Sequence, residues 1–382
     1  MVEPSKVMEL YACGFNAHGQ LGGMDTKKTS NTDIHTWEKI SSGPDIKILF
    51  VGWSSLIVLV DSAIWISGQV QPVPTTNTDL LPTFILEEEL DTEVESVYGS
   101  VLDGPIGVID KERRMWEFAR APNYNESRIM LEPLPRQIIQ GPDFIAMDYS
   151  GHVYAACPLD TVRKEYRLFE FSDYYTCSRW ASLNHPYSTK NTPKHHHIPS
   201  TIKSLIAGAT SFALLTIEGS VLTWGDTRYG GNLARLVSDE DPAATPCLVD
   251  ALGGIPISKI STGGWIFGAL SKDKDLYLWG SGKPGNQDRL VDLLELHAEI
   301  VTLVTIPGVE NIIDFGIGAS HVVVLAEGGT LWGIGANHNG QMSWQHHFRW
   351  VTEWSKLEML PDRAVTSVAC GQLCTVATVY AA

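Results

Sequence analysis

The sequence predicts an all-β fold, a closed seven-bladed β-propeller, on three observations. One strand pattern recurs seven times along the 382 residues. Its period is roughly 50 residues, which is typical of propeller blades built from short strands, and no helical period of that length is present. The two ends of the chain also carry complementary parts of one repeat, which predicts a ring closed on itself.

Five repeats open with two apolar residues three apart and a Gly three further on, as in Ile202, Leu205 and Gly208; in a degenerate repeat Ser100 takes the Gly position, with Gly99 next to it. An apolar strand, a tight turn and a second strand then follow. We expect residues 1–382 to form a single propeller domain. Its blades are predicted to start near these glycines: Gly52, Gly99, Gly141, Gly208, Gly263, Gly318 and Gly371. The third is a partial match, since only Ile138 precedes Gly141.

An aromatic column marks the second strand of the pattern. Turn pairs such as Ser150-Gly151 and Glu218-Gly219 precede it, because these residues adopt or stabilise hairpin conformations. The column consists of Tyr11, Trp65, Trp116, Tyr154, Tyr277 and Trp332, with Leu222 as the exception. A second, mostly apolar column lies two residues further on, so both columns face the same side of their strands.

Closure is predicted from the termini. The last repeat starts at Gly371, and the sequence stops at Ala382 before its second strand. That strand is found at residues 9–14, so the N- and C-terminal strands should pair in one blade. Cys13, Cys370 and Cys374 would meet there. Three thiols could form a metal or redox cluster, but small buried apolar residues are the favoured interpretation.

Composition narrows the classes of partner and compartment. The formal net charge is −16, which disfavours direct binding to nucleic acid and leaves either simple solubility or an acidic face for a basic partner. No apolar run reaches about 18 residues, so no membrane span is expected. The polar N-terminus lacks a secretory pattern, and the six cysteines form no C-x-x-C pair. A reducing compartment is expected: the cytoplasm, with the nucleus as a second location.

No catalytic, phosphate-binding or cofactor motif is found, so the sequence predicts neither an enzyme nor a cofactor or metal site. His195, His196 and His197 could ligate a metal, but three consecutive side chains on a strand cannot face one ion. We favour a solvated loop within the inter-blade segment 158–200. The acidic run at residues 87–95 is likewise expected to be a solvated loop, with a docking patch for basic residues as the alternative.

Aromatic residues and one arginine are the candidates for partner binding, because these types are enriched at binding hot spots. One group lies in the aromatic stretch 344–354, and two tryptophans lie one and two residues after blade glycines, near the rim of the central channel. The candidates are Trp53, Trp265, Trp344, His346, Phe348, Arg349 and Trp350. Packing between blades is an equal alternative for these side chains.

Residues 10–22 resemble a known repeat. They contain Tyr11, Gly14 and Asn16, followed by Gly19-Gln20-Leu21-Gly22. This order is similar to the hallmark of the regulator-of-chromosome-condensation repeats, with Cys13 replacing a tryptophan. The segment 332–342 resembles it again, and Gly318 followed by His321 is similar to the family's second hallmark.

The resemblance implies a propeller and two kinds of function. The founding members are guanine-nucleotide exchange factors for the Ran GTPase, and others are adaptors. The chain is most similar to the fungal alpha-tubulin-suppressor or killer-toxin-insensitivity propellers. This implies a non-catalytic scaffold that forms a heterodimer with the small zinc protein of the diphthamide pathway. It would thereby support Elongator-dependent wobble-uridine modification of tRNA and diphthamide synthesis. The alternative is a guanine-nucleotide exchange factor for a Ran-type small GTPase.

Overall fold

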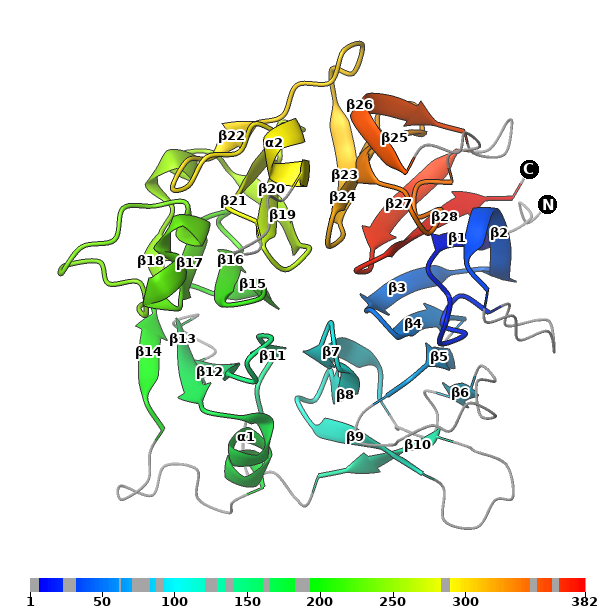
Figure 1. Cartoon of the computed structure of the whole chain (residues 1–382). Coiled ribbons are helices and arrows are strands. Elements are labelled where there is room, and N and C mark those ends of the chain that lie inside the picture. The colour runs from blue at the N-terminus through cyan, green and yellow to red at the C-terminus, as the bar shows by residue number, and fades with distance from the viewer. Residues whose placement is uncertain are drawn as a thin grey trace, which may run out of the picture.

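The computed structural model describes residues 7–22, 32–61, 63–70, 83–86, 92–120, 129–134, 141–160, 165–182, 193–282, 289–343, 349–358 and 364–381. These residues form seven four-stranded antiparallel sheets arranged around one axis (Figure 1). The prediction of an all-β, seven-bladed propeller is therefore confirmed. No helix in these ranges is long and apolar enough to cross a membrane.

We number the blades by the order of their inner strands. Blades 1 to 3 comprise β3 (Ile46–Val51), β4 (Ser55–Val60), β5 (Ala63–Gly68) and β6 (Thr83–Leu86); β7 (Val94–Ser100), β8 (Gly104–Asp110), β9 (Met115–Arg120) and β10 (Ile129–Pro133); and β11 (Phe144–Met147), β12 (Val153–Asp160), β13 (Glu165–Phe171) and β14 (His195–Ile198). The helix α1 (Tyr174–Ala181) lies between β13 and β14.

Blades 4 to 7 comprise β15 (Ile202–Ala207), β16 (Ser211–Thr216), β17 (Val221–Gly225) and β18 (Cys247–Leu248); β19 (Ile257–Thr262), β20 (Ile266–Ser271), β21 (Leu276–Gly280) and β22 (Thr302–Leu303); β23 (Ile312–Ile317), β24 (His321–Ala326), β25 (Thr330–Ala336) and β26 (Trp350–Leu357); and β27 (Val365–Cys370), β28 (Cys374–Tyr380), β1 (Met8–Gly14) and β2 (Ile34–Gly43). Short helices α2 (Arg289–Leu293), η2 (Thr227–Leu233) and η3 (Asp250–Leu252) lie in the connections.

Blade 7 closes the ring, as predicted. Its two inner strands, β27 and β28, come from the C-terminus, and β1 and β2 come from the N-terminus. β1 pairs with β28 in an unbroken antiparallel register from Met8 opposite Tyr380 to Gly14 opposite Cys374. The two ends of the chain thus share one sheet, and both termini lie beside it in Figure 1.

The hydrophobic core is divided into clusters between neighbouring blades. Trp224 and Trp279 are fully buried, and each stacks on a phenylalanine of its own blade at an interplanar angle of 11°. Tyr154 of blade 3 packs edge-on against Trp224 at 5.2 Å between ring centroids. Because every blade buries both faces against its neighbours, the repeats are stable only as a ring.

Close approach of backbones explains the blade glycines. A side-chain carbon at Gly263 would lie 1.9 Å from the carbonyl oxygen of Gly318, and one at Gly371 would lie 2.7 Å from that of Gly52. The residues after these glycines join successive blades by hydrogen bonds such as Ala319 N to Gln372 O at 2.9 Å. We call the end of the ring that carries these turns the glycine face. Connections between third and fourth strands lie at the same end, because neighbouring strands are antiparallel.

Blade 3 departs from the predicted boundaries. Gly141 precedes its inner strand instead of ending it, and the turn at Ser150 and Gly151 joins the first two strands rather than the second and third. Tyr154 therefore lies on β12, the second strand of its blade, whereas the other residues of the column lie on the third strand of theirs. Tyr149 N donates to Ala209 O in the inter-blade ring, so Asp148 occupies the position held elsewhere by Gly. Glycine was a misleading marker here because an aspartate caps the turn instead.

A polar strut crosses the central axis. Gln372 Nε2 of blade 7 donates to the hydroxyl of Tyr149 of blade 3 at 2.9 Å, and it lies 3.4 Å from Gly263 O of blade 5. A side chain at Gly264 would collide with the Tyr149 ring. Burial raises the pKa of Tyr149 to about 12, in keeping with an enclosed phenol. Three blades that are not neighbours are thus connected at the glycine face.

The Asn and Gln of the hallmark segment hold its loop against the next blade. Asn16 Oδ1 accepts a hydrogen bond from Leu21 N at 2.8 Å, which closes the loop on itself. Gln20 Nε2 donates to the carbonyls of Phe15 and Trp53, both at 2.9 Å, and so ties blade 7 to blade 1. Asn337 repeats the first contact in blade 6 by accepting from Met342 N.

Candidate protein-binding face

Trp53, Trp265, Arg349 and Trp350 all lie at the glycine face. The two tryptophans of blades 1 and 5 are in turns that follow inner strands, next to the axis. Trp350 begins β26 opposite Ala336, and the exposed Arg349 accepts a backbone hydrogen bond from Asn337. Trp344, His346 and Phe348 lie outside the described residues. A role of these seven residues in partner binding remains a prediction.

Each of these tryptophans is supported by a neighbouring aromatic or basic side chain. Trp53, which is 39% exposed, packs edge-on against Phe15 at 5.8 Å. Trp265 packs edge-on against Tyr229 at 5.4 Å. The Arg289 guanidinium lies 5.0 Å from the Trp350 ring centre. Large rings that are fixed but still partly exposed can contact a partner without losing much side-chain entropy.

Besides the three tryptophans, the face carries an exposed apolar pair that the sequence analysis did not predict. Leu236 and Val237, in the connection after η2, are 79% and 42% exposed. A side-chain carbon at Gly230 would lie 3.4 Å from the Val237 side chain, so Val237 lies beside the residue that follows Tyr229. We call Tyr229, Leu236, Val237 and Trp265 the blade-4 patch. A hydrophobic pair in a coil was not distinguishable from a short strand by sequence.

The loop that presents Leu236 and Val237 is held in shape by a buried arginine. Arg235 is only 5% exposed, and its guanidinium donates to the carbonyls of Asp241, Pro242 and Thr245 at 2.8 to 3.1 Å. Ser238 Oγ accepts from the backbone amides of Glu240 and Asp241. The exposed apolar pair is therefore preorganised, and exposed acidic side chains flank it.

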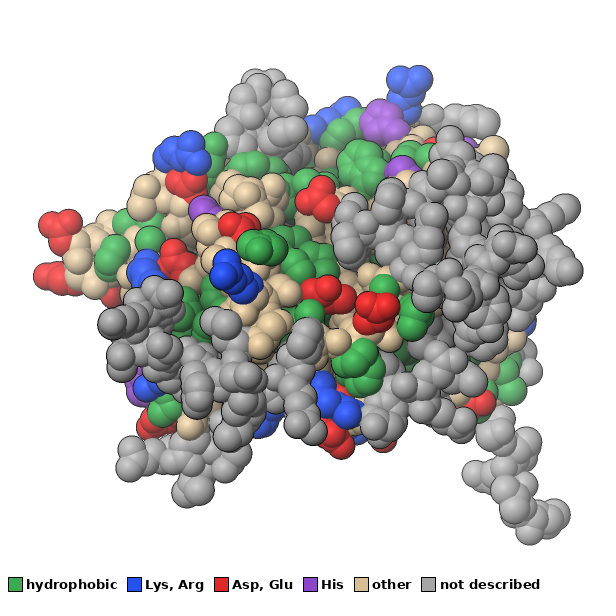
Figure 2. Space-filling model, turned by 90° about the horizontal axis from the view of Figure 1, so that it is seen from below, with side chains coloured by type: hydrophobic (Ala, Val, Ile, Leu, Met, Phe, Trp, Pro, Cys, Tyr) green, Lys and Arg blue, Asp and Glu red, His purple; other side chains and the backbone are tan. Residues whose placement is uncertain are grey.

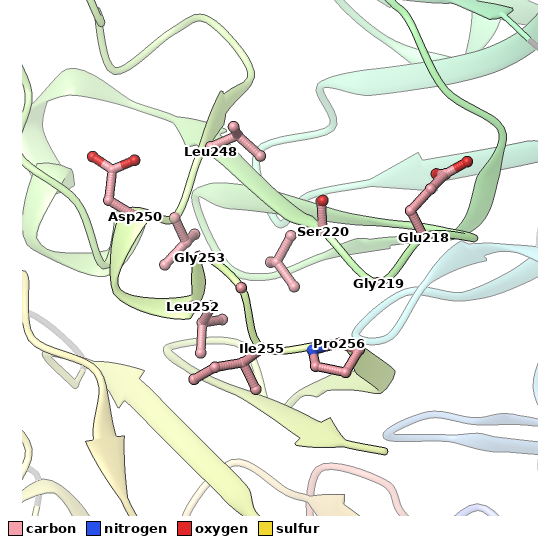
Figure 3. Close-up of a pocket in the computed structure, with 12 residues that line it drawn as sticks. Glu218, Gly219, Ser220, Leu248, Asp250, Leu252, Gly253, Ile255 and Pro256 are labelled. Carbon is pink, nitrogen blue, oxygen red and sulfur yellow. The ribbon is translucent and has the colours of Figure 1, made fainter. Parts of the chain in front are cut away.

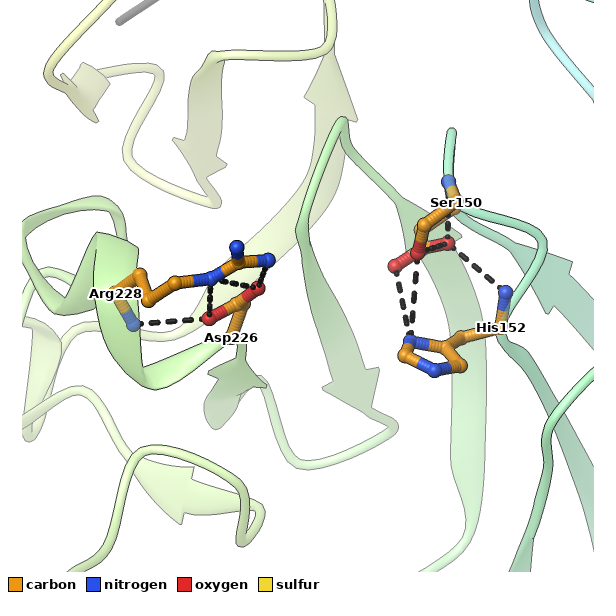
Figure 4. A network of polar contacts seen from close by, with 5 residues as sticks. Ser150, His152, Asp226 and Arg228 are labelled. Atoms are coloured by element: carbon orange, nitrogen blue, oxygen red, sulfur yellow. Dashed lines mark hydrogen bonds and ion pairs between the residues drawn. The ribbon is translucent and has the colours of Figure 1, made fainter.

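Figure 4 shows two polar groups at the glycine face, one after β17 in blade 4 and one in the β11–β12 turn of blade 3. Asp226 pairs with Arg228 through several hydrogen bonds of 2.5 to 3.0 Å, and these bonds lower the pKa of the Asp226 carboxyl. Asp148 Oδ1 accepts from Ser150 N, Ser150 Oγ and His152 N. Since the Ser150 hydroxyl donates to the carboxylate and not to His152, this trio caps a turn and does not form a nucleophile relay.

The three consecutive histidines lie on β14, so the prediction of a solvated inter-blade loop for them is wrong. They pair with β13 as the outer strand of blade 3, within the segment taken to be inter-blade. Their side chains alternate: His196 is half-buried toward Glu170, and burial lowers its pKa, whereas His195 and His197 are exposed. Among the described residues, no group of three His, Cys, Asp or Glu is arranged to hold a metal ion.

The cysteines of blade 7 do come together, as predicted. Cys13 and Cys374 are buried, and Cys13 Sγ donates to the carbonyl of Gln341 at 3.5 Å. Burial raises the pKa of Cys370 and Cys374 to about 12, so both stay protonated thiols at neutral pH.

The predicted acidic run at residues 87–95 is described only in part. Residues 87–91 lie outside the described ranges, and Glu93 forms an ion pair with Lys111.

Other surfaces offer less for recognition. On the opposite face, a hollow of about 310 Å³ lies between the β16–β17 turn and the β18–β19 connection, with Glu218 and Asp250 on its two sides (Figure 3). The edge of the ring seen in Figure 2 carries acidic and basic side chains interspersed with hydrophobic ones. The supported, partly exposed aromatic rings are the distinguishing feature of the glycine face.

The fold and its glycine face define a repeat-built propeller, and comparison with known proteins shows which proteins resemble it. Residues 312–341 match the regulator of chromosome condensation (RCC1) repeat. The chain is 29% identical over 147 residues to the ultraviolet-B receptor UVR8 of Arabidopsis thaliana, and 28% identical over 179 residues to the human probable E3 ubiquitin-protein ligase HERC3. These alignments cover 37% and 47% of this chain but 31% and 16% of the relatives' lengths.

Solved structures agree over nearly the whole chain. Prp20p from Saccharomyces cerevisiae has a TM-score of 0.68 at 14% identity, covering 99% of this chain and 93% of its own. Human WBSCR16 has a TM-score of 0.65 at 14% identity, covering 98% and 100%. These likenesses show the fold. The matched repeat covers residues 312–341 of this fold.

Proposed function

We propose that this protein is a non-catalytic scaffold that binds a partner protein on its glycine face. The observation that carries the proposal is the blade-4 patch. Leu236 and Val237 are exposed in a loop that the buried Arg235 holds in shape. Val237 lies beside Gly230, next in sequence to Tyr229, whose ring packs against Trp265. Exposed apolar groups in a preorganised loop lose little entropy on binding, and a flanking acidic rim favours a basic partner.

The test is a pull-down from cell extract with the intact chain and a variant carrying Leu236→Ser and Trp265→Ala. A matched control is Ile217→Ser, since Ile217 is 43% exposed in a turn on the opposite face. We expect the patch variant to lose the partners that the wild type and the control retain. Equal recovery with all three proteins, each shown to be folded by circular dichroism, would remove the blade-4 patch from the proposal.

The resemblance noted in the sequence gives the leading partner, the small zinc-binding protein of the diphthamide and Elongator pathway, in a cytoplasmic or nuclear heterodimer. In this role the propeller makes and breaks no bonds. It positions the zinc protein and controls its access to other complexes. The two purified proteins should co-elute in gel filtration. Failure to co-elute at micromolar concentrations of both proteins would reject this partner and leave the scaffold role open.

A second candidate is nucleotide exchange on a Ran-type GTPase. It is favoured by the fold similarity to Prp20p, whose structure was described with its binding properties to Gsp1p and histones. Release of a fluorescent guanine nucleotide from such a GTPase should then accelerate when the propeller is added. An unchanged release rate would exclude exchange activity on that GTPase.

A further inference from the structure

A hollow of about 510 Å³ lies at the glycine face between blade 2 and α1. Asp103, in the β7–β8 turn, stands at its edge, and Ile106 and Met147 supply apolar wall. Tyr174 and Tyr175 of α1 complete it, and Tyr175 is 73% exposed. The lining is more apolar than polar but contains two carboxylates, those of Asp103 and Glu117.

Glu117 occupies a position that is uncharged in five of the other six blades and is Glu170 in blade 3. Glu117 pairs with Gly107 in β8, as Leu278 pairs with Gly268 in blade 5. By the same register, the equivalent residues are Ile66, Thr223, Gly333 and Ala12. A carboxylate between blades costs desolvation energy unless its oxygens are satisfied. Its presence here therefore calls for a compensating contact.

Part of the compensation comes from α1. The Tyr174 hydroxyl donates to Glu117 Oε1 at 2.6 Å, and Ser178 Oγ donates to the same atom at 3.2 Å. The Tyr174 hydroxyl is itself 3.2 Å from that of Tyr98. Among the described residues, no hydrogen-bond donor reaches Glu117 Oε2. The carboxylate is thus fixed through one oxygen, while the other remains free to accept from a bound group.

We propose that this hollow is a binding pocket for a lysine or arginine side chain from an extended segment of the partner protein. The cationic group pairs with Glu117, and Asp103 adds negative charge at the edge. The aliphatic stem lies along Ile106 and Met147, and the tyrosine rings offer their faces to the cation. A neutral or anionic group would leave the Glu117 carboxylate unpaired. The proposal deepens the proposed function and rests on it, since it specifies one basic residue of the partner.

The probe for this pocket is the peptide acetyl-Ala-Lys-Ala-amide, with norleucine in place of lysine as the uncharged match. Binding is followed by NMR titration of the intact protein. We expect the lysine peptide to bind at least about tenfold more tightly than the norleucine peptide, since a hydrogen bond to a charged group contributes about 1.5–3 kcal/mol. Equal binding of the two peptides would overturn the proposal.

The variant is Glu117→Gln, which keeps an acceptor for Tyr174 and Ser178 and removes the charge. Its control is Glu132→Gln, on the exposed outer strand of the same blade. Glu117→Gln should lose about tenfold in affinity for the lysine peptide and Glu132→Gln none, with both melting temperatures near that of the wild type. Should Glu117→Gln unfold, Asp103→Asn provides the second test, with a smaller loss of affinity expected. Unchanged affinity in the folded variants would refute the pocket.

The two proposals fail separately. If the blade-4 patch variant releases the partner while Glu117→Gln binds the lysine peptide as tightly as the wild type, the pocket is wrong and the scaffold role stands. If peptide binding depends on Glu117 but the patch variant keeps every partner, the blade-4 patch is not the docking site and the cation pocket stands.

Discussion

Acidification should destabilise this propeller through one buried histidine, His321 of the second hallmark. Its side chain is completely buried beside Gly318, where any side chain would overlap the imidazole. The Thr375 hydroxyl donates to Gln341 O, so it accepts from His321 Nε2 at 3.1 Å. This network assigns the neutral imidazole with its proton on Nε2. Nδ1 is buried without a hydrogen bond of ordinary geometry.

Protonation would place a charge in that apolar site. Burial therefore lowers the pKa of His321 from 6.5 to about 4, and the nearby backbone of Cys374 offsets this only in part. Below pH 6.5 the unfolded chain binds a proton that the folded chain refuses, so stability falls as the pH falls from 6.5 toward 4. The full loss is about 3 kcal/mol, of which about 2 kcal/mol should be gone by pH 5.

The assay is urea unfolding at pH 7.5 and pH 5.0 for the wild type and for His321→Gln. Glutamine can still donate to Thr375 but does not titrate, so its own stability cost appears at both pH values. The wild type should lose about 2 kcal/mol more than the variant between the two conditions. The carboxylates and His196 titrate in both proteins and cancel in this difference. An identical pH dependence in the two proteins would refute the assigned role of His321.

Three further predictions concern the ring and its loops. Gly263→Ala should cost about 3 kcal/mol or more in urea unfolding, because its new carbon meets Gly318 O. Gly308→Ala, which meets no atom within 4 Å, should cost only about 1 kcal/mol for its positive φ, and equal costs would contradict the close-approach argument. Arg235→Met should speed proteolytic cleavage of the loop after it, read by mass spectrometry; an unchanged cleavage rate would show that the guanidinium does not hold the loop. Deleting residues 1–14 should abolish the cooperative thermal transition, because it removes β1 from blade 7. A cooperative transition in the truncated protein would show that the ring closes without β1.

The blades could be predicted from the sequence where the fold requires one residue type at one position. Gly208, Gly263, Gly318 and Gly371 mark blades because inner turns meet neighbouring carbonyls, and the pattern around them located blades 4 to 7. In blade 3, Asp148 satisfies the same turn with its side chain, so the boundary was missed.

The candidate site was predicted less completely, because it depends on which distant residues meet. Trp53 and Trp265 were found from their distance to a glycine, and they do lie on one face. The setting of Glu117 follows from the strand register and from α1, about 60 residues away, and neither is visible in a linear pattern. The exposure of Leu236 depends on a loop that Arg235 holds through hydrogen bonds to distant carbonyls, and the sequence alone does not show these bonds.

The Tyr149–Gln372 strut connects blades that are not neighbours, so a force on one blade can pass directly across the ring. In a simple ring, force on blade 7 passes only to blades 6 and 1. Here it also passes directly to blade 3 and, through Gly263, to blade 5. Separation of β1 from β28 would consequently leave the two sides of the ring joined at the glycine face. The strut is therefore a second connection between the blades, independent of the contacts between neighbours.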